Sequence, residues 1–363
     1  MEDNRESNVI KSADTVQAKC PSCGGFLVYS PENEKLVCLY CGSKVELDLT
    51  PSEIKENDFE QWVAHPEMQS KAETLVAEVS CGQCGARTTF PENTTSFSCA
   101  FCGTPIVLKE SMHKRAWIPE YILPFKVGSK ASNERFRQWA SSLWFAPSGF
   151  SKKLTNVERM KGVYLPYWTY DADTVTDYRG ERGVTRQVRR TVNGKTEIHS
   201  VTDWYPKSGT VRHAFDDVLV PASNSLPTDI AQVLTNWDRN NYVAYKEQFV
   251  RGFLTELYQK DFKDCYPSAK KQMESYITSL VRSDIGGNQQ RIHNLQTAYS
   301  NLKFKHVLLP VWLSAYRYKD KPYIFAVNGR TAQVVGQRPW SVIKILGLVL
   351  VIVAVLVYLF SIN

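Results

Sequence analysis

Eight of the nine cysteines fall into two sets of identical spacing, and this repeat constrains the fold more than any other feature. In each set two Cys-x2-Cys pairs are separated by fourteen residues, and the second set begins 61 residues after the first. A glycine follows the second cysteine of every pair, which permits a tight turn whose amides point at sulfur. Such pairs can place four sulfurs in a tetrahedron around Zn²⁺. The two sets are Cys20, Cys23, Cys38 and Cys41, and Cys81, Cys84, Cys99 and Cys102.

We interpret each set as a zinc ribbon, because strand patterns such as 26–29 and 35–37 lie between its pairs. Disulfides and a redox dithiol are the alternatives, and the reducing cytoplasm inferred below argues against stable disulfides. Four cysteines complete the coordination of each ion, which predicts two structural Zn²⁺ ions that supply roughly 10–16 kcal/mol of folding energy each. The ninth cysteine, Cys265, is interpreted as a small buried apolar residue.

An apolar run near the C-terminus predicts a membrane span. Residues 345–362 contain only two residues outside the hydrophobic letters, and as a helix they would be roughly 27 Å long. A buried strand or helix is the alternative, but strands seldom reach this length. Arg338 and Lys344 precede the run, so the positive-inside rule keeps the preceding residues in the cytoplasm. Since the N-terminus lacks the features of a secretory signal, we expect a single-pass, tail-anchored protein of the cytoplasmic membrane.

Charge is unevenly distributed along the chain. Residues 1–112 carry nine Lys and Arg against seventeen Asp and Glu, a net of −8, whereas the whole chain is +7. Zinc ribbons often bind nucleic acid, but an acidic surface repels phosphate, and four thiolates around Zn²⁺ add negative charge. We therefore expect the ribbons to bind protein partners, with nucleic-acid binding as the alternative.

The pattern as a whole predicts an α+β fold. We expect a disordered N-terminus at 1–14, zinc ribbons at 15–50 and 74–112 around a helical connector at 51–73, a mixed α+β cytoplasmic body at 113–340, and a transmembrane tail anchor at 341–363. Thr50-Pro51-Ser52-Glu53 is a capping box that predicts a connector helix ending before Pro66 and packing the ribbons together or docking a partner. A longer helix is expected at about 267–284, ended by Gly286-Gly287.

Two Asn-Gly dipeptides predict hairpins with two-residue type I′ turns. The turn at Asn193-Gly194 would pair Arg190 with Glu197, and the turn at Asn328-Gly329 would place Phe325 and Ala332 on one face. The first hairpin, 179–195, is rich in arginine, which is typical of a solvated face or of a surface that contacts anionic lipid.

Aromatic residues of the body are interpreted mainly as core. Leu165-Pro166-Tyr167-Trp168 and Leu309-Pro310-Val311-Trp312 form a second repeat. We interpret the rings of Tyr164, Tyr167, Trp168 and Tyr170 as core residues or, alternatively, as rings that stack on bases. A core stripe at helical spacing is expected from Phe136, Trp139, Leu143 and Trp144.

With these motifs the chain resembles a bacterial family of zinc-ribbon membrane proteins. The resemblance rests on the double ribbon, the terminal span and the segments 162–168, 215–223 and 305–312, and it covers nearly the whole chain. Members often carry the labels TFIIB-type zinc ribbon protein or primosomal protein N′-like helicase. The resemblance implies a role beside phage-shock-type and SPFH or virion-core-like proteins, in membrane-stress or microdomain assemblies, and it brings no catalytic residues.

Enzyme motifs find little support in the sequence. The P-loop candidate Asn193-Gly194-Lys195-Thr196 has Arg189 where a P-loop needs glycine, and zinc-protease and serine-hydrolase motifs are absent. Asp171-Ala172-Asp173 could hold a metal-bound nucleotide sugar, but a polar cluster at a strand end is favoured. We therefore expect no enzyme but a cytoplasm-facing adaptor that recruits protein partners to the membrane. The alternative is a membrane-tethered nucleic-acid-binding protein.

Overall fold

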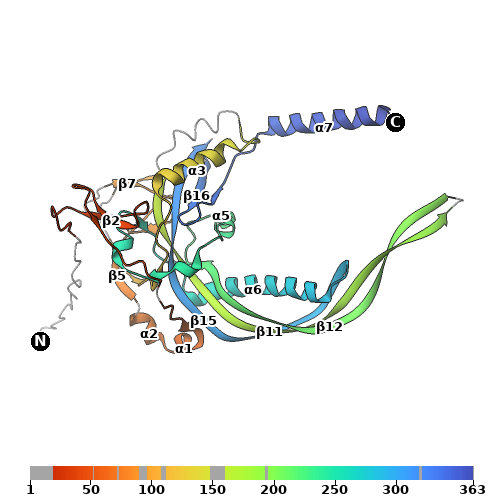
Figure 1. Cartoon of the computed structure of the whole chain (residues 1–363), viewed down its shortest axis with the longest axis horizontal. Coiled ribbons are helices and arrows are strands. Elements are labelled where there is room, and N and C mark those ends of the chain that lie inside the picture. Colours follow the sequence, from red (N-terminus) through yellow and green to blue (C-terminus); the bar gives the residue numbers. More distant parts are fainter. Residues whose placement is uncertain are drawn as a thin grey trace, which may run out of the picture.

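Long antiparallel β-strands form the framework of the molecule. They run through the body and project from it as a curved arm (Figure 1). This computed structural model describes residues 19–51, 53–71, 73–89, 96–107, 112–147, 160–192, 195–318 and 321–362. Over these residues the fold is α+β, as predicted, with an apolar C-terminal helix and two sets of four clustered cysteines near the N-terminus. The long strands are β11 (Lys161–Val192), β12 (Lys195–Pro221) and β15 (Gln289–Tyr318), and β11 lies between the other two.

Short strands extend this sheet at the body end. β10 (Tyr121–Ile122) runs parallel to β15, and β13 (Val243–Ala244) pairs with β10. Further strands of the sheet are β4 (Asn57–Asp58), β14 (Leu254–Thr255), β16 (Lys321–Asn328) and β17 (Val334–Gly336). Because β4 pairs with β15, the sheet joins the connector to a strand more than two hundred residues later in the chain.

Two smaller groups of strands carry the cysteines. The first cysteine unit contains β1 (Leu27–Ser30), β2 (Lys35–Cys38) and β3 (Lys44–Val45), which confirms the strand patterns predicted there. The second cysteine unit contains β5 (Glu73–Ser80), β6 (Arg87–Thr88), β7 (Ser96–Ser98), β8 (Pro105–Val107) and β9 (Met112–Trp117). In it β5 pairs with β6 and β9, and β7 pairs with β8.

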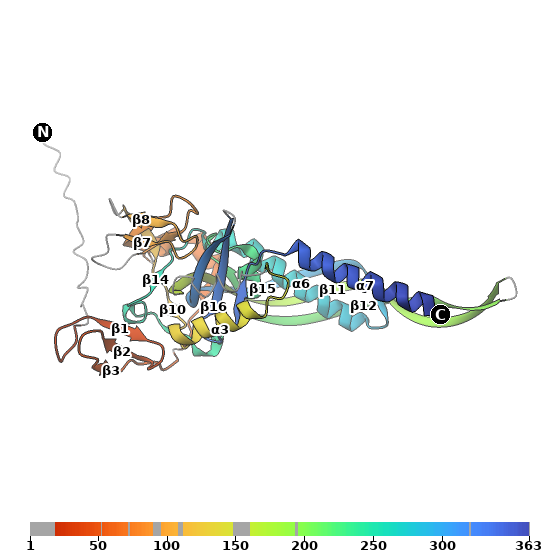
Figure 2. The same cartoon turned by 90° about the horizontal axis from the view of Figure 1, so that it is seen from above.

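The two cysteine units lie on opposite faces of the β11–β15 pair (Figure 2). Side chains alternate between the faces of a strand. On β11, Val163 and Leu165 join the core of the second unit, whereas Tyr164 joins the core of the first. On β15, Leu309 and Leu308 divide in the same way. Both cysteine units are therefore built into the hydrophobic core of the body.

The repeated Leu-Pro-x-Trp motifs lie side by side in this sheet. Leu165 of β11 pairs with Leu309 of β15, so that the two motifs run antiparallel about this point. Trp168 and Trp312 are buried. These tryptophans are core residues, as favoured from the sequence, and are not available to stack on bases.

Helices cover the sheet and its arm. α6 (Phe262–Ile285) lies along the concave side of the arm (Figure 1). Its predicted end is confirmed at Gly286, which has a φ of 70°, but the predicted start at 267 is wrong because Asp261 caps an earlier first turn. The other helical segments are α1 (Phe59–Ala64), α2 (Pro66–Lys71), α3 (Ser129–Ser141), α5 (Thr228–Val233), α7 (Val342–Ile362) and the 3₁₀ turns η1 (Arg239–Asn241) and η2 (Glu247–Phe249).

The connector between the cysteine units differs from the sequence prediction. Its first helix begins after an Asp58 cap rather than after Thr50, and Pro66 starts a second helix instead of following the first. Trp62 packs against Phe304 of β15, with ring centroids 5.5 Å apart. Trp62 also packs against Trp117 of β9, with ring centroids 5.7 Å apart, so the connector docks on both the body and the second cysteine unit.

The helix α3 accounts for only part of the predicted core stripe. Phe136 is buried, and the ring centroid of Trp139 lies 5.5 Å from that of Phe325. Trp144, however, is 78% exposed. The prediction fails there because α3 ends at Ser141 and the helical spacing no longer applies.

The first Asn-Gly hairpin has the predicted register. Val192 pairs with Lys195 and Arg190 with Glu197. The turn residues themselves, 193 and 194, lie outside the described residues, as do residues 1–14, which we expect to be disordered.

The two-residue turn predicted for the second Asn-Gly hairpin is wrong. Val327 pairs with Val334, which leaves a longer loop than a two-residue turn. Asn328 is buried, and its side-chain oxygen accepts hydrogen bonds from the amides of Arg330 and Thr331. Gly329 is needed for close approach rather than for positive φ, because an added Cβ would lie 2.6 Å from a ring carbon of Phe125.

The arm bends where all three long strands are irregular. The pairing of β11 with both neighbours shifts register around Asp171 and Asp173, and Asp217 and Asn301 opposite them have φ of 55° and 52°. Asp171 accepts a hydrogen bond from the Asp217 amide, and Asp173 accepts one from the Asn301 side chain, both at 2.6 Å. Bulges bend a strand, so this acidic pair holds the curvature of the arm. The cluster is polar, as favoured from the sequence, but its predicted position at a strand end is wrong, because Asp171 and Asp173 lie within β11.

Candidate metal centres

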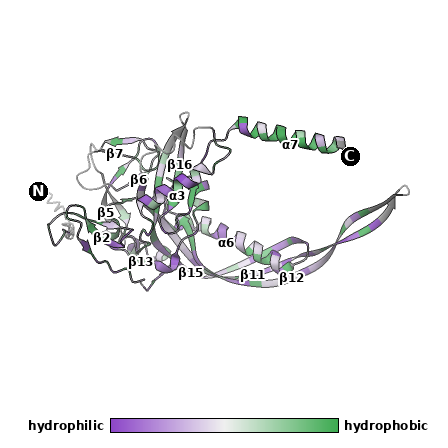
Figure 3. Cartoon of the chain, turned by 45° about the horizontal axis from the view of Figure 1, so that its top comes forward, coloured by the Kyte–Doolittle hydropathy of each residue, from purple (hydrophilic) through white to green (hydrophobic). Residues whose placement is uncertain are grey.

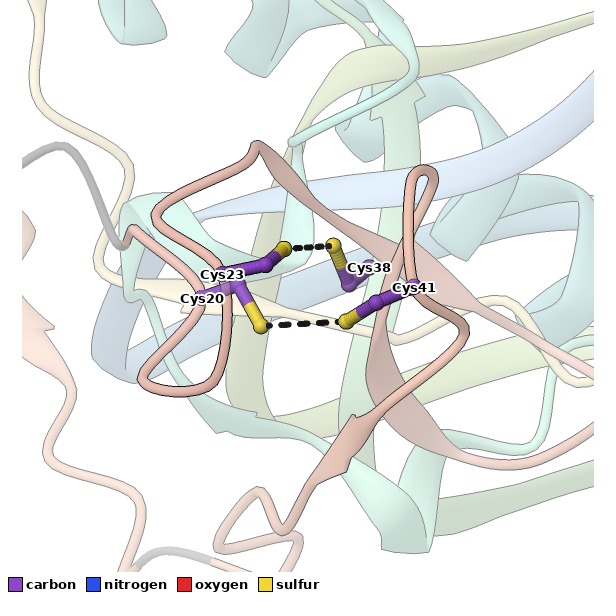
Figure 4. Close-up of side chains that lie close together, drawn as sticks. All are labelled: Cys20, Cys23, Cys38 and Cys41. Carbon is purple, nitrogen blue, oxygen red and sulfur yellow. Dashed lines mark hydrogen bonds between the residues drawn. The ribbon is translucent and has the colours of Figure 1, made fainter.

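Each set of four cysteines is gathered into one cluster. The four Sγ atoms of a set lie within 4.8 Å of one another, and Figure 4 shows the first set, drawn together from two loops. A tetrahedron with metal–sulfur bonds of about 2.3 Å has edges of about 3.8 Å. The shortest Sγ–Sγ distances agree with it: 3.6 Å for Cys20–Cys41, 3.5 Å for Cys23–Cys38, 3.6 Å for Cys81–Cys102 and 3.7 Å for Cys84–Cys99. Both sets can therefore hold a metal ion.

The local backbone prepares the thiols for metal binding. The glycine after each pair has a φ between 71° and 74°, the left-handed region that the tight turn requires: Gly24, Gly42, Gly85 and Gly103. The Ser43 hydroxyl lies 2.8 Å from Sγ of Cys20, and this hydrogen bond, with the amides of Ser22 and Cys23, lowers the pKa of that thiol to about 6. A hydrogen bond with Cys84 lowers the pKa of Cys99 to about 5. In the same sets the pKa of Cys23 is raised to about 12, and the hydrogen bond with Cys99 raises the pKa of Cys84. Cys20 and Cys99 are therefore the thiols that most readily become thiolates, the form that binds metals.

The ninth cysteine lies apart from both clusters. Cys265 is buried on α6, and its Sγ lies 3.8 Å from the Pro221 carbonyl oxygen. Among the described residues it belongs to neither cluster. Its interpretation as a small buried apolar residue agrees with this position.

A second polar cluster was not foreseen from the sequence. Lys305 is only 1% exposed, and its Nζ lies 3.0 Å from Glu56 Oε1 and 2.5 Å from Asp217 Oδ1. Ligand atoms of Glu56, Asp171 and Asp216 also lie within 4.8 Å of one another. We call these five residues the Lys305 cluster. It ties the connector to β11, β12 and β15 at the bend of the arm.

The Lys305 cluster holds a proton as well as an ammonium group. Burial, followed by a hydrogen bond with Glu56, raises the pKa of Asp171 to about 8, so this carboxyl group is protonated at neutral pH. Burial works against a charge on Lys305, but the carboxylate of Asp217 and a hydrogen bond with Glu56 prevail and raise its pKa. The lysine thus balances the acidic groups from within the fold. Lys305, followed by His306 and then directly by an apolar run, is the signal in the sequence that marks this position.

Charges on the arm are partly paired. Arg186 and Asp203 form an ion pair at 2.6 Å across the two-stranded tip, and the Arg291 guanidinium lies 3.7 Å from the ring centroid of Trp204. Beyond Gly183, which pairs with Gln289, β11 pairs with β12 alone. The tip therefore presents a mixed polar surface, in which some of the arginine charge is balanced.

The C-terminal helix α7 is long and apolar enough to cross a membrane. Residues Val342–Ser361 have a mean hydropathy of 3.0, and none of this stretch is buried against the rest of the chain. Figure 3 shows α7 as a largely hydrophobic helix that projects from the body. Near the start of α7, the Nζ of Lys344 donates hydrogen bonds to the carbonyl oxygens of Trp144 and Ala146, both at 2.9 Å.

Comparisons with known proteins find similarity without a function. No family model matches the chain, and no solved structure matches it. The chain is similar to the uncharacterized protein YdjG of Bacillus subtilis (strain 168), with 25% identity over 327 residues. The aligned region covers 90% of this chain and 91% of that protein, so the likeness extends over nearly the full length of both.

Proposed function

We propose that this protein is a tail-anchored, cytoplasm-facing adaptor that recruits a protein partner through its first cysteine unit. In this proposal each cysteine set binds one structural Zn²⁺, since four thiolates in a tetrahedron suit this ion and leave no position for a substrate. α7 is the anchor. The positive charges of Arg338 and Lys344 before it favour a cytoplasmic body.

One observation carries the proposal, and it comes from comparing equivalent positions of the repeat. In the second unit, Ala100 and Phe101 between the cysteines of the last pair are buried, with Phe101 0% exposed in the core beside Leu165. Their equivalents in the first unit are Leu39, 70% exposed, and Tyr40, 75% exposed. The same turn that docks on the body in one unit is thus open in the other.

Exposed apolar side chains of this kind are typical of protein-binding surfaces. Phe26, 50% exposed, lies next to them, since its carbonyl oxygen accepts a hydrogen bond from the Leu39 amide. We call Phe26, Leu39 and Tyr40 the knuckle patch. By analogy with Phe101, its partner presents an apolar β-sheet surface, and the net charge of −8 over residues 1–112 favours a basic rim around that surface. Following the family resemblance, we expect such partners in membrane-stress or microdomain assemblies.

The test is crosslinking of the full-length chain in native membranes, followed by identification of the captured proteins. A Leu39→Ser, Tyr40→Ser double variant should lose the partner while retaining its metal, because both side chains are exposed. The matched control is Val233→Ser, which removes an exposed apolar side chain from α5. Capture that is unchanged in the double variant would contradict the knuckle patch. Capture chiefly of nucleic acid, with affinity that falls steeply with salt, would favour the nucleic-acid alternative.

Anchoring is tested separately. Removal of residues 341–363 should release the protein into the soluble fraction. A truncated chain that still resisted extraction from membranes by salt and carbonate would show that the anchor lies elsewhere.

A further inference from the structure

The segment after α3 is fixed to the first turn of α7, although some two hundred residues separate them in sequence. Besides the two carbonyl contacts of Lys344, the Ser341 amide donates a hydrogen bond to the Phe145 carbonyl oxygen at 2.8 Å. The ring of Phe145 also lies 6.4 Å from that of Trp340, between centroids. These contacts hold the segment 142–147 at the same level as the beginning of α7.

A groove separates the same two segments just beyond these contacts. Its volume is about 580 Å³, and it is open along one side. Its mainly apolar walls include Leu143, Ala146 and Pro147 from the segment after α3, and Gly347, Leu348 and Val351 from α7. The space beside Gly347 is open, because a Cβ added there would meet nothing within 4 Å, so a larger side chain at this position can enter the groove.

The position of the groove along α7 determines its depth in the membrane. A helix rises 1.5 Å per residue, so Gly347 and Val351 lie about 5 and 10 Å further along α7 than Lys344. If the start of α7 is at the membrane interface, these residues are at the depth of the first acyl methylenes. Trp144, 78% exposed, is then at the level of the headgroups, where tryptophan is enriched.

The geometry points to a lipid site: the groove binds one acyl chain of a bilayer glycerophospholipid, with the lipid phosphate at Lys344. This inference rests on the proposed role of α7 as a membrane span. An ammonium group has three N–H donors, and two of those of Lys344 are used by carbonyl groups. The third can donate to a phosphate oxygen. The apolar walls below it match a hydrocarbon chain, and no protein segment is needed to cover them.

The experiment uses the full-length protein in vesicles of phosphatidylethanolamine and phosphatidylglycerol that contain a phospholipid with a photoreactive acyl chain. Labelled peptides are mapped by mass spectrometry. We expect labelling of α7 and of the segment 140–147. Gly347→Phe fills the groove and should lower labelling of 140–147 at least threefold relative to that of α7. The control Leu346→Phe, which points to the other side of α7 at 100° per residue, should leave this ratio unchanged.

The outcomes separate this inference from the proposed anchor. Labelling of α7 without labelling of 140–147, or equal labelling of 140–147 in both variants, would overturn the lipid site and leave the anchor intact. Absence of label from α7 as well would overturn both.

Discussion

The ammonium nitrogen of Lys305 lies 3.0 Å from the carboxylate of Glu56, a residue 249 positions earlier in the chain. Asp217 contacts the same nitrogen at 2.5 Å. This buried network holds the connector, β12 and β15 together beside the bend of the arm. Buried charged side chains are tolerated here because each has a partner of opposite charge. Removal of one partner therefore lowers the stability of the fold.

Replacement of Lys305 by Met should therefore destabilise the protein by about 3–5 kcal/mol, because Asp217 remains as a buried carboxylate without its cation and Glu56 loses the nearer of its two lysines. The matched control is Lys303→Met. Lys303 lies 3.7 Å from the same Glu56 but is half exposed, and exposed pairs contribute about 0–1 kcal/mol. Denaturant unfolding of the detergent-solubilised chain measures both. Equal effects of the two substitutions would contradict the buried network.

Acid sensitivity should depend on His306. Burial lowers its pKa from 6.5 to about 3. Between these pH values the unfolded chain binds a proton that the folded chain does not, so stability falls as the pH drops below 6.5. His306→Phe removes the titrating group, so the variant does not lose this stability in acid. As the pH falls below 6.5, the free energy of unfolding of the variant relative to that of the wild type should rise by up to ~1.4 kcal/mol per pH unit. Unfolding curves at several pH values from about 7.5 to 5 test this, and parallel pH profiles would contradict it.

Substitution of Cys38 should lower the metal content of the protein, whereas substitution of Cys265 should not. Cys38→Ser should lower bound zinc from two ions per chain to one, since the first set loses a ligand. It should also lower the melting temperature, because Cys38 shares a core with Phe125 of the body. Cys265→Ala, the control, should retain both ions. Elemental analysis of protein purified without chelator gives the result, and iron in place of zinc would contradict the proposed metal.

Hydrogen exchange should divide the arm at Gly183. The tip, 184–203, consists of β11 and β12 alone, and two-stranded ribbons are marginally stable in water. Residues 167–183 of β11 lie between β12 and β15. We expect backbone amides of the tip to exchange on the order of tenfold faster or more than those of 167–183, by mass spectrometry. Equal protection would show that another surface covers the tip.

Local patterns in the sequence predicted local structure well. The cysteine spacing predicted both clusters, the apolar run predicted α7, and Gly286 marked the end of α6. The Asn193-Gly194 dipeptide gave the register of the long hairpin. In each case the controlling interactions lie within a few residues.

Features that depend on distant partners were missed. Asn328-Gly329 has the same dipeptide as the first hairpin, but Phe125 and Pro310 pack against Gly329 and decide the loop. Trp144 was assigned to the core by helical spacing, but α3 ends at Ser141, before this residue, and Trp144 is exposed. The Lys305 cluster combines residues from four strands or loops, and no periodicity in one segment reveals it.

The placement of the cysteine units on either face of β11 and β15 also sets the order of folding during synthesis. Ribosomes add about 5–20 residues per second, so the first cysteine set is complete on the order of ten seconds to a minute before β15 exists to cover it. During this interval Leu27 and Tyr29, which are later buried, are exposed to solvent. Early metal capture would fix the turns and protect the thiols from oxidation. The body core can close only after its most distant strand has been made, which makes this a chain of high contact order whose final folding step is slow.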